Sequence, residues 1–276
     1  MFNDFHGKAV LITGGTKGIG LAIGKAFAGH GAHCYLTHRW GSANEDDIKK
    51  QFAELGAPEP TIVEADVSHD EATGELLDLI KKDHDRVEVF ISNVCVVEVA
   101  DGPDSYRRRT LLKSLEYSAW PLVAYPLEMK KRMGQYPRYI VGVSSDGPDN
   151  YFSGYEYVAL SKATMETLTR YFAKRLLDEE ADTNINIVRS RNVPTQAVYE
   201  IFGQSYIDHM ARWAGEEYFV QVEDVANATL ALCSGLLDAM NGQVIQVDKG
   251  AAFSDTLMRL REHLEAHPEL RPRGVE

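Results

Sequence analysis

The sequence predicts an α/β fold in which one doubly wound parallel sheet of about seven strands carries helices on both faces. Three observations predict it. Short runs of apolar, largely β-branched residues alternate with stretches of helical period along the chain. A glycine-rich segment joins the first of these runs to the first helix. No repeat or linker divides the 276 residues, and their hydrophobic content of 44% suffices for one large core.

The expected strands are short and end at polar or glycine-containing turns, as buried parallel strands do. Their alternation with helices implies parallel pairing through right-handed crossovers. In chain order we expect strands at Ala9–Thr13, Ala32–Thr37, Thr61–Ala65, Val87–Ile91, Tyr139–Val143, Ile185–Arg189 and Gln243–Val247.

The first helix is expected directly after the glycines, because apolar residues from Ile19 to Phe27 recur there on one face. Pro121 and Pro126 fall inside a later helical stretch and predict a kink or a boundary. The remaining helices are expected at Asn44–Leu55 (with Asn44 as N-cap), Asp70–Asp83, Tyr106–Met133 and Tyr157–Leu177, with one more before the last strand. Residues 1–250 are expected to form one domain. Residues 251–276 are expected to be a partly helical extension with a disordered end.

Composition excludes several classes of protein. The net charge of −12 argues against nucleic acid as the main partner, because phosphate backbones require a basic face. No apolar run approaches the roughly 18 residues of a membrane span, and the first residues lack the features of a signal peptide. Cys34, Cys95 and Cys233 are scattered and lack metal-ligand spacing, so we expect reduced thiols, no metal site and a cytoplasmic location.

Three glycines follow the first strand in the pattern Thr-Gly-x-x-x-Gly-x-Gly, from Thr13 to Gly20. A Cβ at such positions would block a tight turn, the approach of backbone N–H groups to a phosphate, or helix–strand packing. The positive end of the following helix then faces the anion. A plain turn is the alternative. The pattern predicts a dinucleotide phosphate site formed by Gly14, Thr16, Lys17, Gly18, Ile19 and Gly20.

Residues after the next two strands complete the expected adenosine site. Arg39 and Lys17 put two cations near the ribose, which favours a 2′-phosphate and therefore NADP(H) over NAD(H). Ordinary surface cations are the alternative interpretation. Asp66 and Val67 are placed to contact adenine through a hydrogen bond and an apolar contact.

Ser145, Tyr155 and Lys162 form the expected catalytic group. Ser145 ends the fifth strand, Tyr155 follows ten residues later, and Lys162 lies seven residues after that. A reductase must protonate the atom that becomes anionic when hydride arrives. A phenol with an ordinary pKa near 10 becomes a useful donor when an ammonium stabilises its phenolate. Lys162 can do this and bind the nicotinamide ribose, while Ser145 orients the substrate.

From Lys8 to Gly250 the chain resembles the short-chain dehydrogenase/reductase family, through the glycine pattern and the Ser145, Tyr155 and Lys162 group. The resemblance implies a Rossmann-type dinucleotide-binding and catalytic domain, a nicotinamide cofactor and a Ser/Tyr/Lys proton relay. It also implies dimers or tetramers. Further cofactor contacts are implied for Asn93, for Val193 with the carboxamide, and for Thr195 with the pyrophosphate.

Departures from the family pattern narrow the substrate. The spacing Tyr-x6-Lys between Tyr155 and Lys162 is typical of enoyl-acyl-carrier-protein reductases, whereas Tyr-x-x-x-Lys is usual in the family. Glu116 stands where the usual relay has a helix asparagine, and Ser92–Cys95 replaces Asn-Asn-Ala-Gly. The loop Asn192–Thr195 lacks the usual glycine. Ser145 instead favours a ketoreductase, because many enoyl reductases carry an aromatic residue there and ketoreductases carry serine.

Three functions therefore remain open. The first is NADPH-dependent reduction of an enoyl thioester in fatty acid or related biosynthesis, with Tyr155 as proton donor. Tyr157 is a rival donor five residues before Lys162, although that spacing turns the two side chains further apart on a helix. The second function is reduction of a 3-oxoacyl thioester, a polyketide or another carbonyl. The third is a non-catalytic NADP(H) sensor, which the altered relay motivates.

Other features give weaker indications. Arg107–Arg109 and Lys130–Arg132 could attract an acidic carrier protein or coenzyme A phosphates, or be solvated helix faces. Arg189 and Arg191 could pair with Glu116, bind an anionic substrate or form structural ion pairs. Apolar faces on the two long helices predict a homodimer or homotetramer. The aromatic-rich segment 195–219 is expected to cover the substrate.

Overall fold

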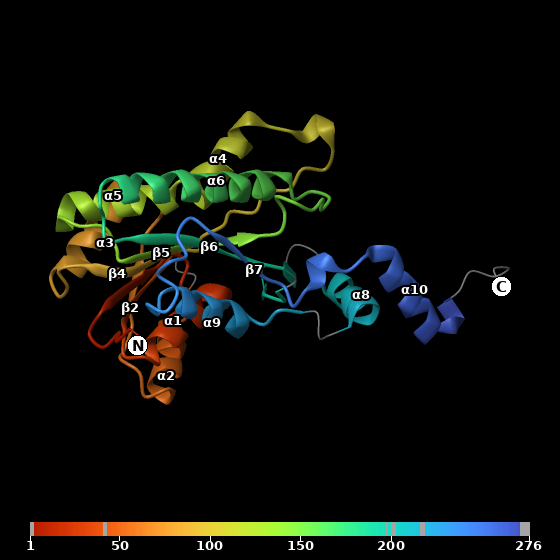
Figure 1. The fold of residues 1–276 in the computed structure, drawn as a ribbon, viewed down its shortest axis with the longest axis horizontal. Helices are drawn as coiled ribbons and strands as arrows, with labels where there is room; N and C mark the ends of the chain where they lie inside the picture. The colour runs from red at the N-terminus through yellow and green to blue at the C-terminus, as the bar shows by residue number, and fades with distance from the viewer. Residues whose placement is uncertain are drawn as a thin grey trace.

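Seven parallel strands form one sheet in the order β3-β2-β1-β4-β5-β6-β7, the doubly wound arrangement that the sequence predicts (Figure 1). The computed structural model describes residues 3–40, 43–191, 193–196, 198–199, 203–215 and 219–270. Every strand begins and ends within two residues of its predicted bounds. The strands are β1 (Ala9–Ile12), β2 (His33–His38), β3 (Thr61–Glu64), β4 (Val87–Ser92), β5 (Tyr139–Ser145), β6 (Asn184–Ser190) and β7 (Val244–Val247).

Helices cover both faces of the sheet (Figure 1). One face is covered by α1 (Gly18–Ala28), α2 (Glu45–Glu54) and α9 (Val222–Leu232). The other is covered by α3 (Asp70–Lys81), α4 (Arg108–Ser118), α5 (Pro121–Met133) and α6 (Glu156–Asp178). Two further helices, α8 (Gln204–Ala214) and α10 (Thr256–Ala266), lie beyond the end of the sheet at the right of Figure 1.

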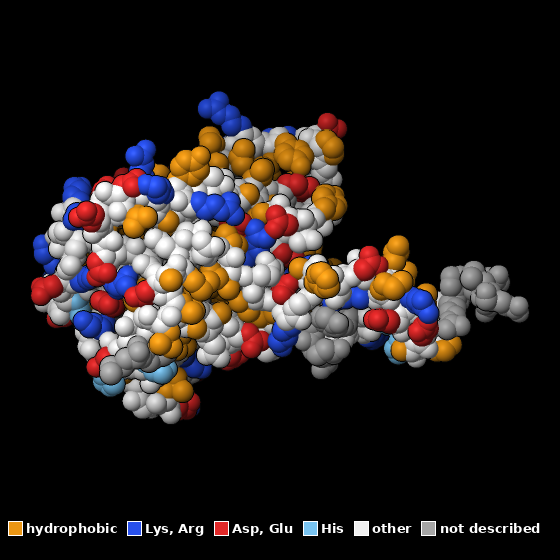
Figure 2. Space-filling view, in the orientation of Figure 1, with side chains coloured by type: hydrophobic (Ala, Val, Ile, Leu, Met, Phe, Trp, Pro, Cys, Tyr) orange, Lys and Arg blue, Asp and Glu red, His pale blue; other side chains and the backbone are white. Residues whose placement is uncertain are grey.

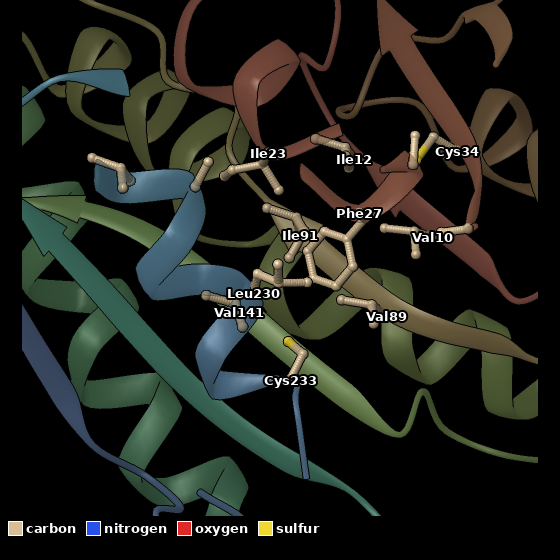
Figure 3. Packing of buried hydrophobic residues seen from close by; sticks show 14 of the residues in the cluster. Val10, Ile12, Ile23, Phe27, Cys34, Val89, Ile91, Val141, Leu230 and Cys233 are labelled. Carbon is tan, nitrogen blue, oxygen red and sulfur yellow. The ribbon is translucent and has the colours of Figure 1, made fainter. Parts of the chain in front are cut away.

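The core has two layers because successive side chains of a strand point to opposite faces. Val10 and Ile12 of β1 pack on the α1 and α9 side, whereas Ala9 and Leu11 pack on the other. Figure 3 shows Phe27 of α1 lying among side chains from the central strands and α9, and it is fully buried. Burying a side chain of this size stabilises the fold by roughly 2–3 kcal/mol.

Proline sets the boundary within the long helical stretch that the sequence predicts. α4 ends at Ser118, and α5 begins with Pro121 at a position where its missing N–H costs nothing. Pro126 lies inside α5. The predicted N-cap is also present, since Asn44 accepts a hydrogen bond from the Asp47 backbone N–H at 3.3 Å.

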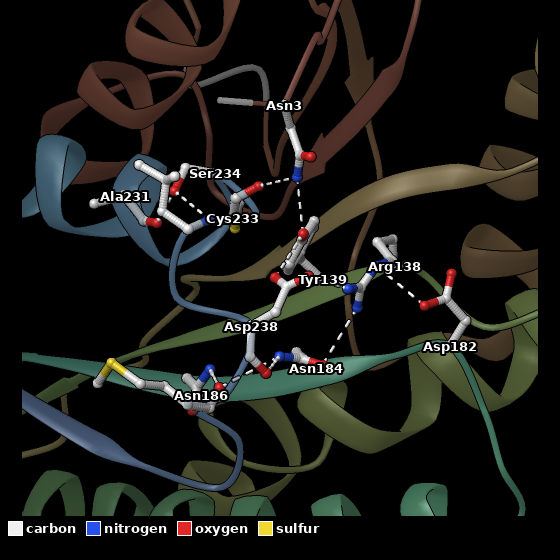
Figure 4. Close-up of polar contacts among 12 residues, drawn as sticks. Asn3, Arg138, Tyr139, Asp182, Asn184, Asn186, Ala231, Cys233, Ser234 and Asp238 are labelled. Atoms are coloured by element: carbon white, nitrogen blue, oxygen red, sulfur yellow. Dashed lines mark hydrogen bonds and ion pairs between the residues drawn. The ribbon is translucent and has the colours of Figure 1, made fainter. Parts of the chain in front are cut away.

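Polar side chains tie the chain's start to the amino ends of β5 and β6 (Figure 4). Asn3 donates from Nδ2 to the Tyr139 hydroxyl at 2.8 Å and to the Cys233 carbonyl at 2.9 Å. Arg138 pairs with Asp182 and Asp238. These bonds satisfy polar groups at the edge of the sheet opposite the predicted site. Among the described residues, none of the helices has the length and apolar content needed to cross a membrane.

The predicted division at residue 250 stays a prediction. Within residues 251–270, α10 spans Thr256–Ala266 and contacts α8. The last six residues, 271–276, lie outside the described part of the chain, so the expectation of a disordered end has no counterpart in the structure.

Candidate active site

A cavity of about 570 Å³ opens at the carboxyl ends of the strands, where ligands of doubly wound sheets bind. Residues from the ends of β1 to β6 and from α8 line it. Nearly every predicted site residue lies in its wall; the exceptions are Gly20 and Asp66. The predicted residues that line it are Gly14, Thr16, Lys17, Gly18, Ile19, Arg39, Val67, Asn93, Ser145, Tyr155, Lys162, Val193 and Thr195.

The glycine turn between β1 and α1 has the backbone geometry that its sequence predicts. Gly14 and Gly18 adopt positive φ angles of 63° and 55°, which side-chain-bearing residues rarely adopt. Gly20 faces inward instead of lining the cavity. A Cβ on Gly20 would lie 2.4 Å from the Gly14 carbonyl oxygen and 2.7 Å from Asn93 Nδ2. Gly20 therefore permits the close packing of the turn, and Gly14 and Gly18 shape its open side.

Asn93 holds this turn from the end of β4. Its Nδ2 donates to the carbonyl oxygens of Thr13 at 3.0 Å and Gly14 at 3.1 Å, and its backbone N–H donates to Thr13 Oγ1 at 3.0 Å. A Cβ on Gly18 would lie 3.8 Å from Cγ2 of Thr195, which belongs to the loop after β6. Asn93 therefore fixes the turn, and the loop that contains Thr195, the expected pyrophosphate contact, lies next to it.

Arg39 and Asp66 contact each other, although the sequence predicted two separate cofactor contacts. Arg39 Nε lies 3.0 Å from Asp66 Oδ2, and its guanidinium carbon lies 3.5 Å from the Trp40 ring centre. Burial pushes the pKa of Asp66 upward, but hydrogen bonds from Ser68 and the charge of Arg39 bring it below its ordinary value. Arg39 lines the cavity and Asp66 lies behind it.

Ser145 and Tyr155 meet in the middle of the cavity. The Tyr155 hydroxyl donates to Ser145 Oγ at 3.2 Å. Burial raises the pKa of the Tyr155 phenol, nearby acidic groups at Cys95 and Asp146 raise it further, and the bond to Ser145 opposes the rise. Tyr155 is therefore held as a protonated donor.

Lys162 lines the same cavity from α6 and is buried. Its Nζ donates to the Val143 carbonyl at 2.7 Å, so the ammonium is anchored to β5 immediately before the serines. None of the hydrogen bonds among the described residues joins Lys162 to Tyr155 directly. The phenol and the ammonium reach the cavity from one helix, and β5 is their common support.

Tyr157, the rival donor, points elsewhere. Its buried hydroxyl accepts a hydrogen bond from the Arg107 backbone N–H at 2.6 Å, below the start of α4. It does not belong to the cavity wall among the described residues. The structure therefore favours Tyr155 over Tyr157, as the helix geometry predicts.

Arg189 and Arg191, for which the sequence left three roles open, form ion pairs behind the cavity. Arg189 pairs with Glu166 of α6 and with Asp149, and Arg191 Nε lies 3.1 Å from Asp146 Oδ2. Of the alternatives for the two arginines, structural ion pairs are confirmed and pairing with Glu116 is wrong, because Glu116 is exposed on α4. Glu166 lies one helical turn after Lys162, and this spacing was an available signal for its burial.

His38 and Asp146 line the cavity with polar groups that the predicted site did not include. His38 is buried at the end of β2, and its Nδ1 has no hydrogen-bond partner among the described residues. Asp146 follows Ser145 directly. The orphaned His38 nitrogen, the cations Lys17 and Arg39, and a turn that tolerates no Cβ all fit an anionic dinucleotide at this end of the cavity.

Comparison with known proteins gives the family. Residues 14–252 match the sequence model of the family described as Enoyl-(Acyl carrier protein) reductase. The chain therefore belongs to this family, and it is an oxidoreductase of the short-chain dehydrogenase/reductase type, as the glycine pattern and the Tyr155 and Lys162 spacing predicted.

Individual relatives agree with this family assignment. The chain is 25% identical over 253 residues to the enoyl-[acyl-carrier-protein] reductase [NADH] FabI of Aquifex aeolicus, covering 89% of this chain and 91% of that protein. It is 26% identical to 3beta-hydroxysteroid dehydrogenase 1 of Eggerthella lenta, covering 91% and 95%. A short-chain dehydrogenase from Burkholderia cenocepacia, solved in complex with NADP, shares the fold with a TM-score of 0.77 at 21% identity, covering 91% and 100%.

Proposed function

We propose that this protein is an NADPH-dependent reductase of enoyl thioesters. One observation carries the proposal: the Tyr155 hydroxyl, bonded to Ser145 at 3.2 Å, shares a cavity with Lys162 and with the glycine turn. The Tyr-x6-Lys spacing and the enoyl reductase among its relatives support the enoyl substrate.

The cofactor would supply hydride to the β-carbon of the enoyl group. Tyr155 then provides the proton that the resulting enolate oxygen requires, and burial keeps its phenol protonated until then. Ser145 orients the thioester carbonyl through the hydroxyl that already accepts from Tyr155. Lys162 holds the ribose and supplies positive charge near the developing anion. The enol then tautomerises: the α-carbon takes a proton from solvent and the oxygen gives its proton up, so the thioester carbonyl is restored and the original carbon–carbon double bond is saturated.

The phosphorylated cofactor is favoured by the cations that face the cavity. Lys17, from the glycine turn, and Arg39, after β2, both line it at the expected adenosine end. The guanidinium carbon of Arg39 lies 3.5 Å from the Trp40 ring centre and 4.8 Å from that of Tyr117, and these contacts restrict the side chain before a phosphate binds. His38 adds an unpartnered nitrogen at the same end. Val193 and Thr195 would contact the carboxamide and the pyrophosphate, and Val67 the adenine.

Carbonyl reduction is the second candidate, and Ser145 is the observation that favours it. A serine that accepts from the catalytic phenol can equally bind the oxygen of a ketone, so the same donor would protonate an alkoxide. The hydroxysteroid dehydrogenase among the relatives also supports a carbonyl substrate.

A homodimer or homotetramer is part of the proposal. Large apolar side chains are exposed on the outer helices, and Figure 2 shows apolar patches at the top of the molecule, over the α4 and α6 region of Figure 1. The exposed residues include Leu112 on α4, Leu127 on α5, and Leu160 and Tyr171 on α6. A twin subunit covering them would bury this surface. An acidic carrier protein could meet the exposed cations Arg108 and Arg109.

A paired assay tests the proposed function. Crotonyl and acetoacetyl thioesters of N-acetylcysteamine are offered separately with NADPH and with NADH, and oxidation of the cofactor is followed at 340 nm. Faster turnover of crotonyl thioester with NADPH is the expected result. Turnover of acetoacetyl thioester alone would contradict the enoyl substrate, and equal rates with NADH would contradict the cofactor.

A further inference from the structure

The cavity carries one buried acid, Asp146, directly after Ser145. It lines the cavity together with Ser145 and Tyr155, and its side chain is 8% exposed. The loops and α8 that form this part of the wall are otherwise largely apolar, with Val97, Phe152, Ile207, Met210 and Phe219 among their lining residues. A carboxylate in such surroundings is costly unless it is paired. Its pairing therefore decides what the cavity can accept.

Arg191 is the partner, and it stands behind the carboxylate. Its Nε lies 3.1 Å from Asp146 Oδ2, and it is not among the described residues that line the cavity. Burial raises the pKa of Asp146, while the charges of Arg191 and Arg189 oppose the rise. The pair thus turns its hydrogen-bond acceptor to the cavity and its cation away.

The turn after β5 holds this carboxylate in place. The Asp146 carbonyl accepts hydrogen bonds from the backbone N–H groups of Asp149 at 3.1 Å and Asn150 at 3.0 Å. Gly147 lets the turn pass against Tyr155, because a Cβ there would lie 2.8 Å from the Tyr155 ring. Asp146 and the catalytic phenol are therefore fixed relative to each other by direct packing of one short segment.

We propose that Asp146 accepts a hydrogen bond from a hydroxyl group of the substrate. The substrate class is then a largely apolar acyl thioester that bears a hydroxyl group near its reacting carbons. A carboxylate or phosphate on the substrate would meet a like charge. Asp146 Oδ2 already lies 3.1 Å from Arg191 Nε and accepts from Asn150 Nδ2 at 3.5 Å, whereas no hydrogen bond in the described part of the chain reaches Oδ1. A purely apolar chain would leave that second oxygen without a donor. An amine would put a second cation beside Arg191 in a buried place. A neutral donor satisfies the pair.

This inference rests on the proposed function for its substrate class. It is tested by the binding of saturated probes, which the enzyme cannot reduce. Octanoyl-N-acetylcysteamine and its 3-, 4- and 5-hydroxy analogues are titrated calorimetrically into the NADP⁺-loaded protein. At least one hydroxy analogue is expected to bind the natural protein about tenfold more tightly than the octanoyl thioester, the typical worth of a hydrogen bond to a charged group. Asp146→Asn and the paired variant Asp146→Leu/Arg191→Leu should lose most of that advantage.

Asp149→Asn is the matched control. Asp149 lies on the same turn, its side chain is 65% exposed, and it pairs with Arg189 away from this cavity. It should keep the full preference for the hydroxy analogue. The inference is overturned if no hydroxy analogue binds more tightly than the octanoyl thioester, or if the preference survives in both Asp146 variants.

Failure of the inference and failure of the proposed function look different. Turnover of crotonyl thioester without any hydroxyl preference supports the function and overturns the inference. A hydroxyl preference that depends on Asp146, in a protein that turns over neither crotonyl nor acetoacetyl thioester, contradicts the function and supports the inference.

Discussion

The cavity has an arginine–aspartate pair at each end, and the two pairs face it in opposite senses. Near the glycine turn, Arg39 lines the cavity and Asp66 lies behind it, 3.0 Å away. Beyond Tyr155, Asp146 lines the cavity and Arg191 lies behind it, 3.1 Å away. The same pair of residue types thus presents a cation to one end and an acceptor to the other.

In our proposal, each pair recognises its ligand through the member that lines the cavity. A backing carboxylate keeps Arg39 in place without removing its charge, so an anion can still share the guanidinium. Behind Asp146, the Arg191 guanidinium opposes the rise in pKa that burial causes at this carboxyl. A third group, Arg138 with Asp182 and Asp238, lies at the opposite edge of the sheet and serves the fold alone (Figure 4).

The largest effect is expected for Tyr155, whose phenol lies between the two pairs. Tyr155→Phe should lower kcat for thioester reduction by about 10²–10⁴, because the enolate loses its proton donor. The dissociation constant for NADPH should stay within about twofold, since the cofactor contacts remain. Steady-state kinetics and fluorescence titration measure the two quantities.

Tyr157→Phe is the control for that variant, because its hydroxyl serves the Arg107 backbone and not the cavity. Its kcat should stay close to that of the natural protein. If both variants lose activity equally, the assignment of the donor to Tyr155 is wrong.

The second effect concerns Arg189 and Glu166, a buried pair outside the cavity of the candidate active site. Glu166→Leu leaves buried Arg189 without its inner partner and should lower the free energy of unfolding by about 3 kcal/mol. Glu166→Leu/Arg189→Met should restore much of the loss, because only the exposed carboxylate of Asp149 is then left without its partner and no buried charge is unpaired. Urea unfolding measures both. Equal loss in the single and double variants would contradict a charge penalty.

The third effect breaks the adenosine-end pair. Arg39→Gln should weaken NADPH binding about tenfold, or about 1.4 kcal/mol, and leave NADH binding unchanged, because only the 2′-phosphate needs the cation. Asp66→Asn should act in the opposite direction by freeing Arg39 for the phosphate. Calorimetric titration with both cofactors measures this. A parallel loss for NADPH and NADH in Arg39→Gln would show that the residue acts on structure.

The smallest effect belongs to the pair that faces no ligand. Arg138→Met should cost about 1 kcal/mol of stability, because its partners Asp182 and Asp238 are largely or partly exposed and solvent screens them. Cofactor affinity should not change. Thermal unfolding and NADPH titration measure the two. A loss of stability as large as that of Glu166→Leu would contradict the distinction between exposed and buried ion pairs.

Local patterns predicted the fold, and nearly all of the site residues that they predicted lie in the cavity wall. The spacing of Gly14, Gly18 and Gly20 specifies a backbone geometry that only glycine provides, and Pro121 can begin a helix but not continue one. Ser145 ends β5, Tyr155 is the N-cap of α6 and Lys162 lies in α6, so their common cavity follows from the topology.

Pairing across the sheet could not be predicted in the same way. Arg39 and Asp66 follow different strands, and no local period indicates that they contact each other. Asp146 precedes a glycine, which is typical of an ordinary turn, so its burial comes from packing against Tyr155 and Arg191. Glu166 and Arg189 lie on different elements and pair only once α6 packs on the sheet.

Deuterium transfer tests the central claim most directly. The protein is incubated with crotonyl-N-acetylcysteamine and NADPH carrying deuterium at the transferred position of C4, in ordinary water, and the product is examined by NMR. We predict a butyryl thioester with deuterium at C3 and a solvent-derived proton at C2. Tyr155→Phe should slow its formation by about 10²–10⁴. Deuterium found only in a 3-hydroxyacyl product, when acetoacetyl thioester replaces crotonyl thioester, would contradict the account.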